Sequence, residues 1–248
     1  MRFSGKRAIV TGGAKGIGAA ITRALVAEGA RVAIADIDER AAMELAEGMA
    51  DAIRVVKLDV TDEGDWNDIV ADLRDHWGGV DILVNNAGIA SAFTTIEDRR
   101  PEDWDAMMAI SLRGPFLGTR ALLPVFRSQG SGAIVNLSSV GGIGQSQIID
   151  LAYACSKAGL RVLTRVTAAQ HASEGVRCNS VHPGPIDTEM VRLAYGSGGA
   201  LEKRLERIPM GRLIELREVV SAILYLASDD ATCISGVALA VDGAALVQ

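Results

Sequence analysis

The chain has 248 residues, of which 49% are hydrophobic and only 4% aromatic, so its core is expected to be aliphatic. The formal net charge of −6, without a basic run, argues against a nucleic acid or an anionic membrane as partner. The lack of an apolar leader or spanning segment, together with three cysteines that have no disulfide or metal-ligand spacing, favours a cytoplasmic, metal-free protein with reduced thiols.

Short β-rich runs alternate with stretches of helical period along most of the chain. The predicted strands cover residues 7–10, 31–35, 54–58, 82–84, 133–137, 177–181 and 237–241. The predicted helices cover residues 17–28, 39–49, 62–77, 101–126 and 151–173. Nearly continuous apolar strands in this alternation indicate an α/β fold with a parallel sheet buried on both faces. No internal repeat or change of composition marks a linker, so we expect one domain over residues 1–248.

The first predicted strand leads into a glycine-rich turn, Thr11-Gly12-Gly13-Ala14-Lys15-Gly16-Ile17-Gly18. Glycines let the backbone turn sharply and approach a pyrophosphate, which the amides of a helix amino terminus then bind. The spacing is a GxxxGxG variant and not GxGxxG. Asp36 ends the second predicted strand, 20 residues after Gly16, where a carboxylate would bind the adenosine ribose. An ordinary tight loop is the alternative, but this context favours dinucleotide binding.

The residues around Asp36 favour NAD over NADP. A carboxylate at this position would repel a 2′-phosphate, and the next residue is Ile37 instead of an arginine that could bind one. Lys15 instead favours NADP, because a cation in the glycine turn could reach the 2′-phosphate.

Tyr153 and Lys157 are four residues apart in the predicted helix 151–173, a spacing that puts both side chains on one face. A free tyrosine has a pKa near ~10, and a neighbouring ammonium lowers that pKa by stabilising the phenolate. The pair is therefore a candidate acid or base. In the alternative interpretation, Tyr153 packs in the core and Lys157 is solvated.

Together these segments resemble the short-chain dehydrogenase/reductase family over essentially the whole chain. The matching segments are Thr11-Gly12 through Gly18, Asp59-Val60, Asn85-Asn86-Ala87-Gly88, Ser138-Ser139, Tyr153 with Lys157, and Pro183-Gly184 followed by Thr188. The resemblance implies a single Rossmann-type, doubly wound domain. Its seven-stranded parallel sheet would have the order 3-2-1-4-5-6-7 and would be flanked by helices, and the protein would be a homotetramer or homodimer.

The resemblance also assigns cofactor-binding roles. Asp59 would bind the adenine amino group and Val60 would line the adenine slot, whereas without the resemblance Asp59 could simply cap the next helix and Asn85-Asn86 could form a plain turn. The backbone of Ile186 and the hydroxyl of Thr188 would bind the nicotinamide carboxamide. The full implied set is Gly12, Lys15, Gly16, Ile17, Gly18, Asp36, Ile37, Asp59, Val60, Asn86, Ala87, Gly88, Tyr153, Lys157, Pro183, Gly184, Ile186 and Thr188.

The implied catalytic residues are Ser139, Tyr153 and Lys157, with Ser138 the less favoured serine. Ser139 would hold the substrate oxygen, Tyr153 would exchange its proton, and Lys157 would lower the pKa of Tyr153 and bind the nicotinamide ribose. Ser111 stands where the family usually has an asparagine that holds a water next to the lysine, so this proton relay is expected to be rerouted or slower. We interpret His182 as a packing or turn residue.

Residues 189–213 are expected to form a lid over the substrate, hinged at the glycines of residues 196–199. Apolar residues in this lid and in residues 140–151 suit a hydroxysteroid or cyclic apolar alcohol, although they could instead pack on the core or on another subunit. Gln145, Gln147 and Asp150 could alternatively serve a polyhydroxylated substrate. The apolar tail Ala244-Ala245-Leu246-Val247 suggests a subunit contact.

The predicted function is thus NAD-dependent interconversion of a secondary alcohol and its ketone. The alternatives are a 3-oxoacyl-thioester reductase, which usually prefers NADPH, a sugar or polyol dehydrogenase, and a catalytically silent NAD-binding protein.

Overall fold

The computed structural model describes residues 1–49, 51–89, 94–144, 150–187 and 205–247. Seven strands form one sheet in the order β3-β2-β1-β4-β5-β6-β7, and every neighbouring pair is parallel. The predicted fold class and strand order are therefore confirmed. The strands are β1 (Arg7–Thr11), β2 (Arg31–Asp36), β3 (Ile53–Lys57), β4 (Ile82–Asn85), β5 (Gly132–Leu137), β6 (Val176–Pro183) and β7 (Ala238–Val241).

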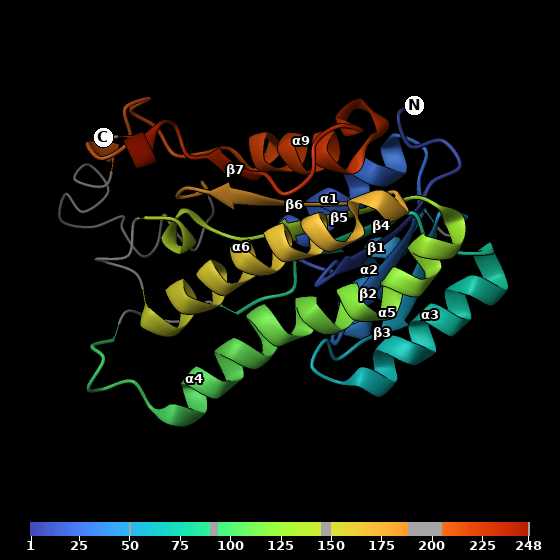
Figure 1. Cartoon of the computed structure of the whole chain (residues 1–248), viewed down its shortest axis with the longest axis horizontal. Coiled ribbons are helices and arrows are strands. Elements are labelled where there is room, and N and C mark those ends of the chain that lie inside the picture. Colours follow the sequence, from blue (N-terminus) through green and yellow to red (C-terminus); the bar gives the residue numbers. More distant parts are fainter. Residues whose placement is uncertain (50, 90–93, 145–149, 188–204, 248) are drawn as a thin grey trace.

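Helices cover both faces of the sheet (Figure 1). The helices α1 (Gly16–Ala27), α2 (Glu39–Ala46) and α9 (Leu216–Ala227) pack on one face, and α3 (Glu63–Trp77), α5 (Gly114–Gln129) and α6 (Leu151–His171) pack on the other. Successive residues of a strand point to opposite faces. Val10 of β1 accordingly lies in the core next to α1 and α9, whereas Ile9 lies in the core next to α3 and α5. This explains why the strands read as continuous apolar runs.

The helix expected over residues 101–126 is interrupted by a π-helical turn, which corrects that prediction. The segment from Pro101 to Gln129 consists of α4 (Pro101–Met108), the π turn η1 (Ala109–Arg113) and α5. The cause is Pro115, which has no N–H to donate to the carbonyl of Ser111 four residues earlier and whose ring crowds that carbonyl. Helix α9 was not among the predicted elements, and the remaining predicted bounds differ from the observed ones by a few residues at most.

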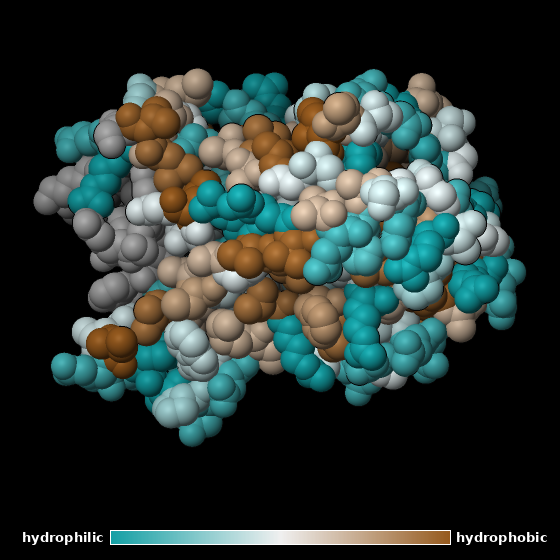
Figure 2. All heavy atoms as spheres, in the orientation of Figure 1, coloured by the Kyte–Doolittle hydropathy of each residue, from teal (hydrophilic) through white to brown (hydrophobic). Residues whose placement is uncertain are grey.

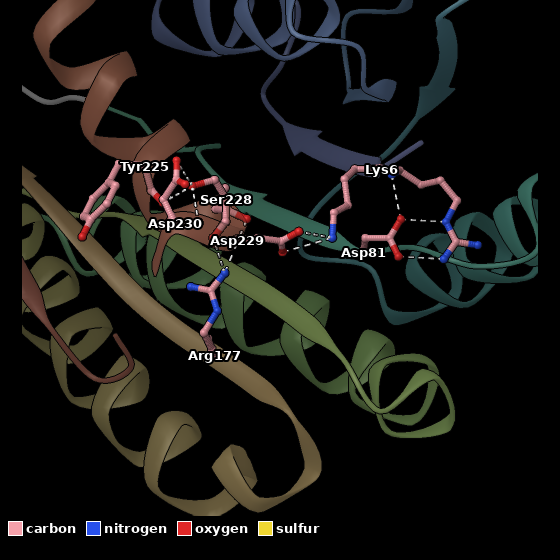
Figure 3. A network of polar contacts seen from close by, with 9 residues as sticks. Lys6, Asp81, Arg177, Tyr225, Ser228, Asp229 and Asp230 are labelled. Atoms are coloured by element: carbon pink, nitrogen blue, oxygen red, sulfur yellow. Dashed lines mark hydrogen bonds and ion pairs between the residues drawn. The ribbon is translucent and has the colours of Figure 1, made fainter. Parts of the chain in front are cut away.

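At the amino ends of the strands, polar contacts tie distant parts of the chain together (Figure 3). The Arg177 guanidinium donates to the carbonyl oxygens of Leu226 at 2.7 Å and of Ser228 at 2.9 Å, and so caps the carboxyl end of α9. Lys6 pairs with Asp229, and Arg7 pairs with Asp81 at 2.7 Å. These contacts stabilise the edge of the sheet formed by the amino ends of the strands. Within the described ranges, no helix combines the length and the hydrophobicity that a membrane span requires.

Candidate functional site

A cleft of about 660 Å³ runs along the carboxyl ends of the strands, a volume usual for small-molecule sites. It brings together the ends of β1, β2, β4, β5 and β6 and the first turns of α6. Of the predicted site residues, Thr188 lies outside the described residues and Ser111 lies beneath the lining. The predicted residues that line the cleft are Gly12, Lys15, Gly16, Ile17, Gly18, Asp36, Ile37, Asp59, Val60, Asn86, Ala87, Gly88, Ser139, Tyr153, Lys157, Pro183, Gly184 and Ile186.

Some lining residues were not predicted. They are Ala35, Leu58, Ile89, Ile110 and Leu137, and Ser138, the less favoured of the two candidate serines, also lines the cleft. Ala35 is the last residue but one of β2, Leu58 directly follows β3 and Leu137 ends β5, so their position at the carboxyl edge could be read from the sequence. Ile89 and Ile110 lie in the connection after β4 and in the π turn, and nothing local in the sequence marks them.

The glycine turn after β1 is held in place by Asn86. Its side-chain amide donates to the carbonyl oxygens of Thr11 at 2.8 Å and Gly12 at 2.9 Å. Gly12 has a φ of +59°, which favours glycine. A Cβ on Gly18 would lie 2.0 Å from the Gly12 carbonyl oxygen, so only glycine allows this close approach.

The amino end of α1 fits a diphosphate. Its N-cap residue, Lys15, makes no side-chain capping hydrogen bond, so the first amides of the helix keep their hydrogen-bonding capacity. A Cβ built on Gly16 would meet nothing within 4 Å, which leaves open space in front of these amides. Amides and helix dipole together favour an anion there.

Asp36 lies at the end of β2 with its carboxylate turned to the glycine turn. One oxygen accepts from the Ala14 amide and the other from the Asp38 amide, each at 3.0 Å. Each carboxylate oxygen can accept a further hydrogen bond, so two ribose hydroxyls would fit. The Lys15 ammonium, which argued for a 2′-phosphate, is paired with Asp38 at 2.6 Å.

The alternative role of Asp59 as a helix cap is wrong. Helix α3 is capped by Asp62, which accepts from the amides of Gly64 and Asp65. Asp59 instead accepts from the amide and hydroxyl of Thr61 at 2.9 and 2.8 Å, and its side chain remains at the cleft beside Val60.

Tyr153 and Lys157 lie in the first two turns of α6 and both line the cleft, as their spacing predicts. The Lys157 ammonium lies 5.6 Å from the centre of the Tyr153 ring. Ser139, at the end of β5, hydrogen-bonds Tyr153, and its Oγ also accepts from the Gly141 amide at 3.1 Å. Three groups from two elements thus meet at one point of the cleft.

The pKa of Tyr153 is raised and not lowered as expected. Burial of the hydroxyl raises this pKa, and the hydrogen bond with Ser139 acts in the opposite direction. Lys157 is only 5% exposed, and burial lowers its pKa to about 8. Its ammonium donates to the Leu137 carbonyl oxygen at 2.8 Å instead of reaching the phenol. At neutral pH the site therefore holds a protonated phenol beside an ammonium.

Ser111 is completely buried in η1 and donates to the sulfur of Met107 at 3.5 Å. The space next to Gly88 connects it to Lys157, because a Cβ on Gly88 would lie 3.6 Å from Ser111 Oγ and 3.7 Å from Lys157 Nζ. The serine hydroxyl is thus close to the lysine, but within the described residues it has only a weak sulfur acceptor.

Two buried residues lie behind Ser139. The Ser138 hydroxyl donates to the backbone carbonyl of Lys157 at 3.0 Å, which supports the choice of Ser139 as the serine that faces the cleft. His182 is fully buried, and its Nδ1 lies 2.9 Å from the Ser139 carbonyl oxygen. Because a carbonyl only accepts, Nδ1 carries the proton, and Nε2 accepts from Ser180 at 2.8 Å. The packing role expected for His182 agrees with this geometry.

Asp150 is the N-cap of α6 and is 3% exposed, so it does not offer its carboxylate to a polyhydroxylated substrate. An aspartate just before the first apolar residues of a helix is a readable capping signal. Gln145 and Gln147 lie outside the described residues, as does most of the expected lid. In the described ranges, no three His, Cys, Asp or Glu side chains are grouped to hold a metal ion.

Comparison with known proteins agrees with this geometry. A family model described as enoyl-(acyl carrier protein) reductase matches residues 12–244. The 2-(R)-hydroxypropyl-CoM dehydrogenase of Xanthobacter autotrophicus is 39% identical over 96% of this chain and 97% of its own length. The 3-alpha-(or 20-beta)-hydroxysteroid dehydrogenase of Mycobacterium tuberculosis is 38% identical over 98% of this chain and 90% of its own length. The crystal structure of gox2181 superimposes with a TM-score of 0.95 at 34% identity and covers 100% of this chain and 98% of its own.

Proposed function

The chain belongs to the short-chain dehydrogenase/reductase family, and on this premise we propose that it transfers a hydride between NAD(H) and a secondary alcohol or its ketone. The favoured substrate is a hydroxysteroid or another cyclic apolar alcohol. The observation that carries the proposal is the meeting of Ser139, Tyr153 and Lys157 in the same cleft as the glycine turn.

The residues along the cleft fit a dinucleotide whose adenosine end lies near Asp36 and Asp59 and whose nicotinamide end lies near Lys157. The amides at the start of α1 would bind the diphosphate, Asp36 the adenosine ribose, and Asp59 and Val60 the adenine. Lys157 would bind the nicotinamide ribose, with Pro183, Gly184 and Ile186 beside the ring; Thr188 keeps its predicted role there. When bound, the cofactor would supply the hydride donor or acceptor.

NAD is favoured over NADP by the charges at the adenosine end. Asp36 would place its carboxylate where a 2′-phosphate would have to bind. Lys15, the one cation in the turn, pairs with Asp38, which weakens its attraction for such a phosphate.

Tyr153 would act as the acid in ketone reduction. In alcohol oxidation the base would be its phenolate, which the Lys157 ammonium and the positive charge of bound NAD would stabilise. The raised pKa of Tyr153 keeps the phenol protonated at neutral pH, which prepares it to give a proton to a developing alkoxide. Ser139 would hold the same oxygen: its Oγ accepts from Gly141, and its proton, which is now directed to Tyr153, would be donated to the substrate oxygen when substrate binds. Lys157, with a pKa of about 8, is mostly an ammonium at neutral pH and would stabilise the phenolate after transfer. Ser111 is proposed to take the place of the asparagine that usually holds a water next to the lysine, and proton exchange between Lys157 and solvent is expected to be slower as a result.

The substrate class is supported by apolar side chains in the lining of the cleft, which include Leu137, Ile89 and Ile186. It is also supported by the hydroxysteroid dehydrogenase among the relatives. A 3-oxoacyl-thioester reductase is the second candidate. It is favoured by the similarity to the 3-oxoacyl-[acyl-carrier-protein] reductase of Thermotoga maritima, 37% identical over the whole of both chains, and it is disfavoured by Asp36. The expected lid over residues 189–213 stays part of the proposal.

We also propose that the chain is one domain that assembles as a homodimer or homotetramer in the cytoplasm. Figure 2 shows hydrophobic side chains gathered over α5 and α6, and the exposed fractions of Phe116, Val162 and Val166 are 45%, 60% and 45%. An exposed apolar patch of this kind supports a contact with a second copy. Light scattering at micromolar concentration that found only monomers would contradict this assembly.

The test is to follow the absorbance of NADH with a panel of hydroxysteroids, cyclohexanol, a 3-hydroxyacyl thioester and a polyol. We expect turnover of the cyclic alcohols, loss of turnover in Tyr153→Phe, and unchanged NADH binding in that variant, because only the proton-transfer group is lost. Tyr225→Phe is the matched control, since Tyr225 lies on α9 away from the cleft. Clear NADH binding without turnover of any compound would favour the catalytically silent alternative, and an active Tyr153→Phe would overturn the assignment.

A further inference from the structure

A buried carboxylate at the amino end of α6 is bonded directly to the backbone of Tyr153. Asp150 Oδ1 accepts from the Tyr153 amide at 3.0 Å, and the Asp150 carbonyl oxygen accepts from the Ala154 amide at 2.9 Å. The first turn of α6, and with it the direction in which the phenol leaves the helix, therefore depends on this one residue.

The second oxygen of the same carboxylate binds the connection between β4 and α4. The Arg99 guanidinium pairs with Asp150 Oδ2, and the Thr94 hydroxyl donates to that oxygen at 3.3 Å. The side chains of Arg99 and Asp150 are only 8% and 2% exposed, whereas residues 95–98 between the two anchors are exposed. An exposed loop is thus held at both ends by one buried oxygen.

This loop is linked to the cleft through Asp150 and α6. Tyr153, whose amide binds the same carboxylate, lines the cleft, and so does Ile89 at the start of the connection between β4 and α4. A buried guanidinium and carboxylate are costly unless paired, so the pair strongly favours the arrangement in which the loop lies against α6.

We propose that Asp150 and Arg99 are positioning residues for this reaction. Oδ1 of Asp150 places Tyr153 relative to Ser139, and the ion pair of Oδ2 with Arg99 holds the loop of residues 94–99 against the amino end of α6, from which Tyr153 enters the cleft. The inference rests on the proposed role of Tyr153. The two oxygens have separable effects, because an asparagine can still accept from the Tyr153 amide but cannot form the ion pair.

The experiment compares Asp150→Ala, Asp150→Asn and Arg99→Met, using the alcohol of the panel that the unmodified protein oxidises fastest. Asp150→Ala should lower kcat by up to about a hundredfold, the effect of misplacing a reacting group by about 1 Å. Asp150→Asn should recover most of that kcat and keep a KM for the alcohol several-fold above that of the unmodified protein. Arg99→Met should raise KM in the same way. NADH affinity, measured by fluorescence titration, should stay unchanged in all three.

Asp62→Ala is the matched control, because it removes the same type of cap from α3, whose residues do not line the cleft. It should lower the unfolding midpoint without a change in kcat or KM. Arg99→Met alone could fail to fold, because it leaves the buried Asp150 carboxylate without its partner. The Asp150→Asn, Arg99→Met double variant removes that carboxylate, so it should fold and still show the raised KM for the alcohol. Wild-type kcat in Asp150→Ala, or wild-type KM in both Asp150→Asn and the double variant, would overturn the inference. An active Tyr153→Phe would overturn the proposed function instead, whatever the Asp150 variants do.

Discussion

Replacing Lys157 by methionine is expected to abolish turnover and at the same time to stabilise the protein near neutral pH. Burial lowers the pKa of Lys157 from 10.5 to about 8, and the residue is 5% exposed. At about 1.4 kcal/mol for each pH unit between these values, the buried ammonium costs roughly 3 kcal/mol of unfolding free energy below pH 8. Methionine removes this cost but leaves the Leu137 carbonyl without its donor, a loss of about 1–3 kcal/mol. A net gain of about 1 kcal/mol at pH 7 follows.

The pH dependence is the sharper measurement. Between pH 8 and pH 10.5 the folded protein binds fewer protons at Lys157 than the unfolded chain does, so stability rises with pH over this range. The difference in unfolding free energy between the unmodified protein and Lys157→Met should therefore shift by about 3 kcal/mol in favour of the former, with about two thirds of the shift complete near pH 9.5.

Urea unfolding followed by tryptophan fluorescence measures this difference, since Trp66 is fully buried and reports unfolding. Lys57→Met is the control for the loss of a lysine from an exposed position. If the two stability curves of the unmodified protein and Lys157→Met run parallel from pH 7 to about pH 10, burial does not penalise the ammonium and the reasoning fails.

Three further predictions concern the cofactor end and the opposite edge of the sheet. Asp38→Ala should release Lys15 and improve NADPH binding relative to NADH by about two- to fivefold, the scale of an exposed ion pair, and Lys15→Ala in the same chain should cancel that gain; fluorescence titration with both cofactors measures it. Gly18→Ala would place a Cβ 2.0 Å from the Gly12 carbonyl oxygen, so it should lose NADH binding and about 1–3 kcal/mol of stability, and full NADH affinity in this variant would contradict the tight-turn argument. Arg7 holds the pKa of Asp81 below its usual range, although burial acts to raise it, so this carboxylate contributes stability that is present above pH ~4 and lost as pH falls through its folded pKa. Asp81→Asn should lower the unfolding free energy by about 2 kcal/mol at pH 7 and weaken the acid dependence, which acid titration followed by circular dichroism would reveal.

The strands and the glycine turn were predictable because their signals are local. Continuous apolar runs such as β4 and β5 occur only where both faces are covered, and Gly12 and Gly18 occupy positions that a side chain would obstruct. Helix α9 was missed although its signals were present, since Glu215 and Glu218 form a capping box ahead of apolar residues.

Other features depend on distances that only the folded chain defines. Arg99 and Asp150 are 51 positions apart, and no local pattern pairs these two charges among many others. The direction of the Tyr153 pKa was predicted wrongly because the sequence shows the neighbouring lysine but not how deeply the hydroxyl is buried. The π turn was not predictable in the same way. The missing N–H of Pro115 was visible in the sequence, but a kinked α-helix would have accommodated it as well.

The π turn η1 also determines how tolerant this segment is to changes in length. It contains one residue more than a regular helical turn would need, and each residue of an α-helix advances the chain by about 100° around its axis. Removing one residue between Ala109 and Arg113 would therefore turn η1 into a regular α-helical turn and leave α4 in nearly the same orientation against α5. Met107, now 1% exposed, would stay buried, and Arg99 would stay close to Asp150. A single-codon deletion is thus expected to be tolerated better in this turn than in the regular helices α4 and α5, where it would rotate one part of the helix by that angle.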